Sequence, residues 1–274
     1  MLRAAVVQMA STPLDPADNL ARIETWLAHA ADEGARLVVF PECIVTGYFL
    51  SGPEAEAIAE PIPGLRTEHL ARACARHALS AVVGLIERSP DGDCFNAAVL
   101  AGPEGSLAVY RKTHLLCLGV DRYLTRGDRL APIVSVANAR VGLLICYDLR
   151  FPEPMRVLAL DGAQVILLPT AWPATAGFYP DFLARARAAE NGVHLLAANR
   201  VGQERGHAFL GRSLIVGPDG EVLAEAPSEG ETMLVADLDL QRSDAKHRVF
   251  EPGEYEVDLL GDRRPEQYGR LVEM

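Results

Sequence analysis

The chain has 274 residues, of which 49% are hydrophobic and 23% charged, with a formal net charge of −11 at pH 7. That balance and length are typical of one globular α/β enzyme domain spanning residues 1–274. The acidic excess argues against a nucleic-acid partner, because phosphate binding needs clustered Lys and Arg, and no apolar run is long enough to suggest a membrane partner.

Apolar strand-like runs and amphipathic helical segments alternate along the chain. A first strand is predicted at 2–9, followed by a helix at 16–33 whose apolar residues recur at helical spacing. GPEG at 102–105 and GPDG at 217–220 are predicted to be hairpin turns. The remaining predicted elements, in order, are strand 36–40, helix 65–78, strands 80–87, 94–101, 106–112 and 140–146, helix 153–161, strand 163–168, helix 180–191 and strand 193–198.

The character of the strands indicates the fold class. Segments 141–146 (VGLLIC) and 165–169 (VILLP) are apolar throughout, which indicates burial on both faces of a sheet. The hairpins add antiparallel pairs, so the sheet is predicted to be mixed. Alternation of helices and strands favours a layered α/β sandwich, although periodicity alone also fits a barrel.

The cysteines indicate a reducing environment. The chain has five, with no CxxC pair and no Cys/His cluster at zinc spacing. The N-terminal segment is predicted to be a strand rather than a signal peptide. Together these features predict a cytoplasmic protein with free thiols and no metal site.

Three reactive side chains stand at the ends of predicted strands. Glu42 follows an apolar strand, where partial desolvation would raise its pKa toward that of a useful base; the alternative is a cap or surface acid. Lys112 could stabilise an oxyanion, or could be a solvated charge. Cys146 could be a nucleophile presented by a sharp turn, or a small buried hydrophobe. The backbone N–H of Tyr147 is suited to be a second oxyanion donor.

Several segments together resemble the nitrilase (carbon-nitrogen hydrolase) superfamily, over nearly the whole chain. The three central ones occur in the family's order and hold Glu42, Lys112 and Cys146. The matching pieces are FPE (40–42), YRKTHL (110–115), CYDLRFPE (146–153), PTAWP (169–173), ARAAENGVHLLAANRVG (186–202), FLGRSLIVGPDG (209–220) and RRPEQYG (263–269).

The resemblance implies a fold and a mechanism. The fold would be a four-layer αββα sandwich with mixed central sheets, usually dimerised, with the tail at 250–274 in contact with a neighbouring subunit. Glu42 would act as general base and then general acid, Lys112 would support the tetrahedral intermediate, and Cys146 would form a thioester acyl-enzyme. No metal or organic cofactor is required.

Other residues are expected to support the reaction or bind substrate. Many family members have a second Glu in the loop after the Lys; the best match here is Asp121, one methylene shorter, with a supporting role or none. Trp172 is expected to wall the substrate site rather than simply pack in the core. Arg150 could pair with a substrate carboxylate or form a structural ion pair.

The segment CYDLRFPE looks most like the amidase branch that includes omega-amidases. The expected function is hydrolysis of a small linear carboxamide to acid and ammonia. N-carbamoyl hydrolysis and nitrile hydrolysis are the two enzymatic alternatives. The non-enzymatic alternative is an interaction scaffold that has the same fold but no catalytic activity. The expected partners are a small-molecule amide and a second copy of the chain.

Overall fold

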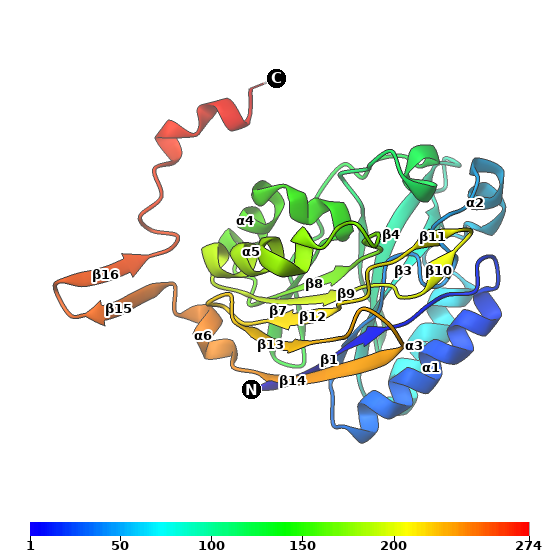
Figure 1. The fold of residues 1–274 in the computed structure, drawn as a ribbon, viewed down its shortest axis with the longest axis horizontal. Helices are drawn as coiled ribbons and strands as arrows, with labels where there is room; N and C mark the ends of the chain where they lie inside the picture. Colours follow the sequence, from blue (N-terminus) through cyan, green and yellow to red (C-terminus); the bar gives the residue numbers. More distant parts are fainter. Residues whose placement is uncertain (274) are drawn as a thin grey trace.

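Two six-stranded sheets form the centre of the computed structural model, which describes residues 1–273 (Figure 1). The strand order of the first sheet is β14 (Thr232–Leu238), β1 (Leu2–Gln8), β2 (Leu37–Val39), β3 (Ser80–Arg88), β4 (Cys94–Gly102) and β5 (Gly105–Arg111). The β1–β2 and β2–β3 pairs are parallel and the other pairs are antiparallel, so the sheet is mixed as predicted.

The second sheet repeats this mixed pattern. Its strand order is β13 (Val222–Glu225), β12 (Leu214–Val216), β9 (His194–Ala198), β8 (Val165–Pro169), β7 (Ala139–Leu143) and β6 (Val134–Val136). The β7–β8 and β8–β9 pairs are parallel, and antiparallel strands complete the sheet on both sides.

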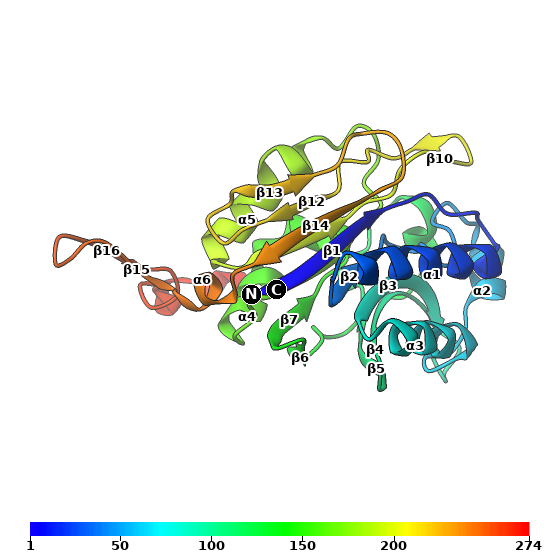
Figure 2. The same cartoon turned by 90° about the horizontal axis from the view of Figure 1, so that it is seen from below.

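Alternation of side chains along β1 shows how the layers stack. Val6 belongs to the apolar core shared by both sheets, whereas Ala5 and Val7 face the helices on the other side. Helices α1 (Pro16–Asp32) and α3 (Leu65–His77) cover the first sheet, as Figure 2 shows. The second sheet is covered by α4 (Pro152–Leu160) and α5 (Ala184–Asn191). The predicted αββα sandwich is confirmed.

The structure differs from the sequence prediction at several elements. Strand β14, which pairs along the whole of β1, was not predicted, because its side chains are mostly half-buried and give no strong apolar pattern. The predicted strand 140–146 ends earlier, at Leu143, and a turn follows it. Also unpredicted are α2 (Gly52–Ile58), α6 (Leu240–Asp244), and a short hairpin of β10 (Gln203–Glu204) and β11 (His207–Ala208).

The C-terminal part of the chain leaves the sandwich as an arm (Figure 1). It begins after α6 with the hairpin of β15 (His247–Glu251) and β16 (Tyr255–Asp258). Phe250 and Tyr255 stack on each other at 4.5 Å between ring centroids, yet both are more than half exposed. Contact of residues 250–274 with another subunit stays a prediction. Within residues 1–273, no helix has both the length and the apolar character to cross a membrane.

Candidate active site

Four of the predicted site residues come after the carboxyl ends of strands, whereas Asp121 lies in the 3-10 helix Gly119–Tyr123. Glu42 comes after β2, Lys112 after β5, Cys146 after β7 and Trp172 after β8. Strand β5 has the same direction as β3, because each pairs antiparallel with β4. Carboxyl ends of parallel strands are where α/β sheets usually place ligands, so the topology itself brings these distant segments together.

Lys112 lies between two carboxylates in a fully buried cluster. Its Nζ is 2.6 Å from Glu42 Oε1 and 2.6 Å from Asp121 Oδ2, and all three side chains have no exposed surface. The shorter side chain of Asp121 therefore reaches the lysine. Asn96, on β4, joins the cluster by donating from Nδ2 to Glu42 Oε1 (2.7 Å) and to Asp121 Oδ1 (2.8 Å).

Sequence reasoning missed Asn96. The signal that could have found it is a polar side chain inside the otherwise apolar strand CFNAAVLA. A fully buried amide needs hydrogen-bond partners, and here both partners are carboxylates of the cluster.

Cys146 occupies a strained position directly after its strand. It opens a 3-10 helix, Cys146–Arg150, and its φ of 45° lies in the left-handed region that non-glycine residues rarely adopt. Such strain is common at functional sites, where it fixes the direction of one side chain. The sharp turn expected here is present, and the thiol lines a cavity.

Burial and charge set the protonation of the cluster. Burial raises the pKa of the Cys146 thiol well above its usual value; the Glu42 carboxylate adds to this, and Lys112 opposes it. Burial also raises the pKa of Glu42, again against the effect of Lys112. For Lys112, burial lowers the pKa, but Asp121 and Glu42 outweigh it, so the ammonium stays charged. A thiol must lose its proton before it can act as a nucleophile, and Glu42 is the buried carboxylate whose charge acts on Cys146.

A buried carboxylate, Asp148, connects the segment after β5 to the turn that presents Cys146. Its Oδ2 accepts from Tyr110 Oη at 2.8 Å and from the Ile145 N–H at 2.9 Å. Its Oδ1 accepts from the His114 N–H at 3.1 Å. These bonds join the two segments that hold Lys112 and Cys146.

The cavity beside Cys146 has a volume of about 380 Å³ and is mainly aromatic and apolar. Trp172 is fully buried in its wall and stacks on Tyr179, with ring centroids 4.9 Å apart. Arg150 lies with its guanidinium carbon 4.7 Å from the centre of the Phe178 ring. The other lining residues are Tyr48, Leu116, Leu118, Tyr147, Ala171, Pro173, Thr175 and Ala176.

Two further predictions concern polar groups at this cavity. Arg150 is exposed and forms no ion pair with any residue in 1–273, so the structure gives no support to a structural ion pair. The Tyr147 amide, immediately after the thiol, makes no backbone hydrogen bond within the described chain. Both groups are therefore available to a ligand.

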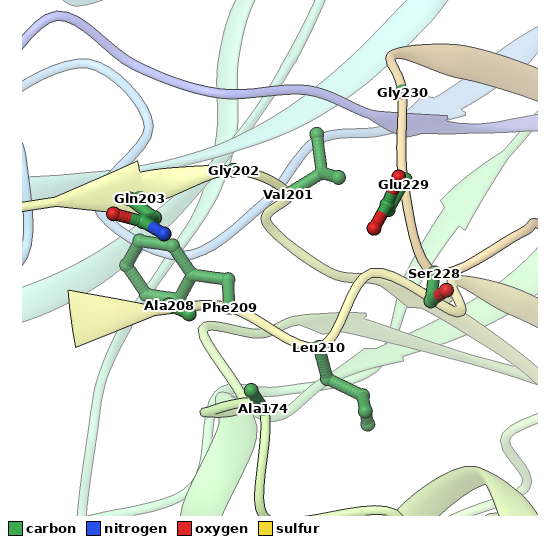
Figure 3. Close-up of a pocket in the computed structure, with 10 residues that line it drawn as sticks. All are labelled: Ala174, Val201, Gly202, Gln203, Ala208, Phe209, Leu210, Ser228, Glu229 and Gly230. Atoms are coloured by element: carbon green, nitrogen blue, oxygen red, sulfur yellow. The ribbon is translucent and has the colours of Figure 1, made fainter.

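A second depression, of about 500 Å³, lies beside the β10–β11 hairpin. Figure 3 shows Gln203 and Phe209 on one side of it and Ser228 and Glu229 on the other. It holds none of the predicted site residues, and its one charged lining residue is exposed. The cavity beside Cys146 is therefore the candidate active site.

The fold and this cluster agree with a comparison of the chain with known families. The model of the family described as carbon-nitrogen hydrolase matches residues 3–248. The chain belongs to this family, the nitrilase superfamily, and it is a carbon-nitrogen hydrolase with amidase relatives.

Individual relatives cover most of the chain. A protein named nitrilase from Pyrococcus abyssi is 38% identical, covering 98% of this chain and 100% of its own length. The omega-amidase NIT2 of Danio rerio is 34% identical, covering 87% of this chain and 88% of its own. The solved NitN amidase of Nesterenkonia sp. AN1 has a TM-score of 0.82 and 32% identity, covering 99% of this chain and 100% of that chain.

One solved structure of the Nesterenkonia amidase bears on the chemistry of the family. In a glutamate-to-glutamine mutant of that amidase, the acetamide moiety of fluoroacetamide is covalently added at the active-site cysteine. That mutant has a TM-score of 0.82 and 31% identity to this chain.

Proposed function

We propose that the protein is an amidase that hydrolyses small linear carboxamides to carboxylic acid and ammonia, with Glu42, Lys112 and Cys146 as its catalytic residues. The observation that carries the proposal is the buried Lys112 held by two carboxylates, next to a thiol that faces a cavity. This arrangement supplies a base, a fixed positive charge and a nucleophile, which are the requirements of acyl transfer.

The proposed reaction proceeds through a thioester. Glu42 takes the thiol proton as the Cys146 sulfur attacks the amide carbon, and the oxyanion accepts hydrogen bonds from Lys112 and from the Tyr147 N–H. The intermediate collapses when the C–N bond breaks and Glu42 donates its proton to the leaving nitrogen. Glu42 then deprotonates a water that attacks the thioester; the C–S bond breaks and the proton returns to the sulfur.

The cavity supports a substrate with an apolar acyl chain and a carboxylate at its far end. Phe178 and Tyr179 offer apolar surface for the chain, and the fully buried Trp172 supports this wall by stacking on Tyr179. Arg150 has an unpaired guanidinium at the same cavity, and guanidinium groups bind carboxylates through two parallel hydrogen bonds. The omega-amidase relatives are consistent with this substrate class.

A panel of compounds tests the proposal. Amides with and without a terminal carboxylate, N-carbamoyl compounds and nitriles are mixed with the protein, and ammonia and intact mass are recorded. We expect ammonia from the amides and a mass increase equal to the acyl group on Cys146, absent in Cys146→Ala. The matched control is Cys74→Ala, a buried cysteine on α3 that should keep both signals.

Other results of the panel would contradict the proposal. An adduct that persists in Cys146→Ala would exclude this nucleophile. Carbon dioxide released with ammonia would identify an N-carbamoyl hydrolase. Nitrile hydrolysis is the second candidate, supported by the Pyrococcus abyssi relative named nitrilase, and ammonia from nitriles but not from amides would establish it.

The proposal extends to assembly and location. We propose a homodimer in which the C-terminal arm contacts the second copy, because the arm leaves the sandwich with exposed aromatic side chains.

We also propose the cytoplasm as the compartment of the protein. All five cysteines are unpaired and four are buried, which suits a reducing environment.

A further inference from the structure

Asn96 closes a ring of hydrogen bonds around the buried cluster. Lys112 Nζ donates to Glu42 Oε1 and Asp121 Oδ2, and Asn96 Nδ2 donates to Glu42 Oε1 and Asp121 Oδ1. The Asn96 amide nitrogen has two hydrogens, so each carboxylate receives one of them. The main chain of Asn96 contributes too, since its carbonyl accepts from the Lys112 N–H at 2.8 Å.

The ring makes the two oxygens of Glu42 different. Both donors bind Oε1, whereas Oε2 is buried and has no hydrogen-bond partner within residues 1–273. A carboxylate held by the lysine alone could rotate about a single contact. With two donors converging on one oxygen, the other is left free for the Cys146 proton and for water.

The ring also offsets an excess of negative charge. Two carboxylates and one ammonium leave one net negative charge in a cluster with no exposed surface. Hydrogen bonds donated to a carboxylate favour its charged form, so the Asn96 amide counteracts the effect of burial on the pKa of Glu42. An apolar residue at this place in β4 would remove both bonds at once.

We propose that Asn96 is a positioning residue of the reaction, which orients Glu42 with Oε2 toward Cys146 and holds both carboxylates in place around Lys112. This inference rests on the proposed function, in which Glu42 is the base. Asn96 itself would touch neither the substrate nor the reacting sulfur.

The test measures Cys146 reactivity without requiring a substrate. Iodoacetamide alkylation of Cys146 is followed against pH by peptide mass spectrometry in the wild type, Asn96→Ala and Asn96→Asp. The aspartate variant keeps the size of the side chain, so it also covers the case in which the alanine variant fails to fold. The kcat and KM for an amide identified by the panel complete the comparison.

We expect the midpoint of the alkylation profile to move to higher pH by about one unit in Asn96→Ala, because losing a donor to a carboxylate raises the proton affinity of the thiol–carboxyl pair. The shift should be larger in Asn96→Asp, which adds a negative charge. We also expect kcat to fall about tenfold, matching one pH unit, with little change in KM.

A matched control separates positioning from stability. Asn19 on α1 is equally buried and makes three hydrogen bonds, to the main chain of Thr12 and Val45. Asn19→Ala should lower stability like Asn96→Ala but leave the alkylation midpoint in place.

The outcomes distinguish this inference from the proposed function. If Glu42→Gln leaves the wild-type alkylation profile unchanged, Glu42 is not the base and the proposed function fails. If Glu42→Gln changes the profile but both Asn96 variants match the wild type, only the positioning role of Asn96 is overturned.

Discussion

At the scale of single residues, the cluster depends on the balance between burial and charge. Lys112 is the only cation in contact with Glu42 and Asp121 among the residues that the structure describes, and it keeps its proton because both acids are near. Asp121 contacts Lys112 at 2.6 Å although the resemblance leads one to expect the longer Glu. In a site without exposed surface, the shorter acid fits because the loop lies close to the lysine.

Replacing Asp121 with Asn should have a pH effect opposite in sign to that of the Asn96 variants. The Asp121 charge raises the pKa of Glu42, so its removal lowers that pKa. The acid limb of kcat/KM reports the free enzyme's base and should therefore move to lower pH. We also expect kcat to fall about tenfold or more, because Lys112 loses one of its two anchoring charges. A pH series of initial rates measures both effects.

The result that contradicts this account is an acid limb that stays in place or moves to higher pH in Asp121→Asn. Exposed Asp128 provides the control, since Asp128→Asn removes a charge of the same sign at the surface and should leave the profile unchanged. If Asp121→Asn and Asp128→Asn shift the acid limb by the same amount, the overall charge of the protein, and not the buried contact with Lys112, determines the pH at which that limb falls.

At the scale of elements, the site lies at the ends of strands, and a glycine on β3 allows the turn that holds Glu42 to pack against that strand. Gly84 on β3 lies under the turn that holds Glu42, with its N–H bonded to the Pro41 carbonyl at 3.3 Å. A Cβ built on Gly84 would be 2.3 Å from the Cys43 nitrogen and 2.8 Å from the Glu42 Cα. Both neighbours are backbone atoms, so the turn itself would have to move.

Gly84→Ala should therefore lower both stability and activity. Overpacking of a buried site typically costs about 1–3 kcal/mol of unfolding free energy, and displacement of the Glu42 main chain should reduce kcat by tenfold or more. Urea unfolding and steady-state rates measure the two effects. Gly269→Ala is the control, because a Cβ there meets no atom within 4 Å. A Gly84→Ala variant with wild-type activity would contradict this prediction, because it would show that the turn can move without displacing Glu42 from its working position.

The helices and strands also differ in how well the sequence predicts them. Apolar runs and helical periodicity predict most of the sandwich, because burial on both faces leaves a plain pattern in strands such as β8. Half-buried β14 lacks such a pattern and pairs with β1 from the opposite end of the chain. Asn96 was missed for a related reason: its role depends on Glu42 and Asp121, which only the fold brings beside β4.

At the scale of the whole molecule, the hairpin of the C-terminal arm has too little contact with the sandwich to bury its two stacked aromatic side chains. Its base is fixed, since Lys246 Nζ donates to the Asn191 and Gly192 carbonyls at the end of α5 (2.8 and 2.7 Å). Burial lowers the pKa of Lys246 to about 8. Beyond this point Phe250 is 60% exposed and Tyr255 55% exposed. Stacked aromatic side chains on an extended hairpin are typical of a surface that another chain covers.

The double variant Phe250→Ser/Tyr255→Ser should therefore weaken self-association. An aromatic residue at the centre of an interface often contributes about 2 kcal/mol or more, which is about thirtyfold in affinity, so we expect the dimer dissociation constant to rise at least about thirtyfold. Sedimentation velocity over a range of concentrations measures it. The control is Tyr123→Ser, which removes an aromatic side chain of similar exposure (54%) away from the arm. A wild type that sediments as a monomer would overturn the homodimer proposal. A double variant that associates like the wild type would instead show that the contact lies elsewhere, because the aromatic pair would then be dispensable to a dimer that still forms.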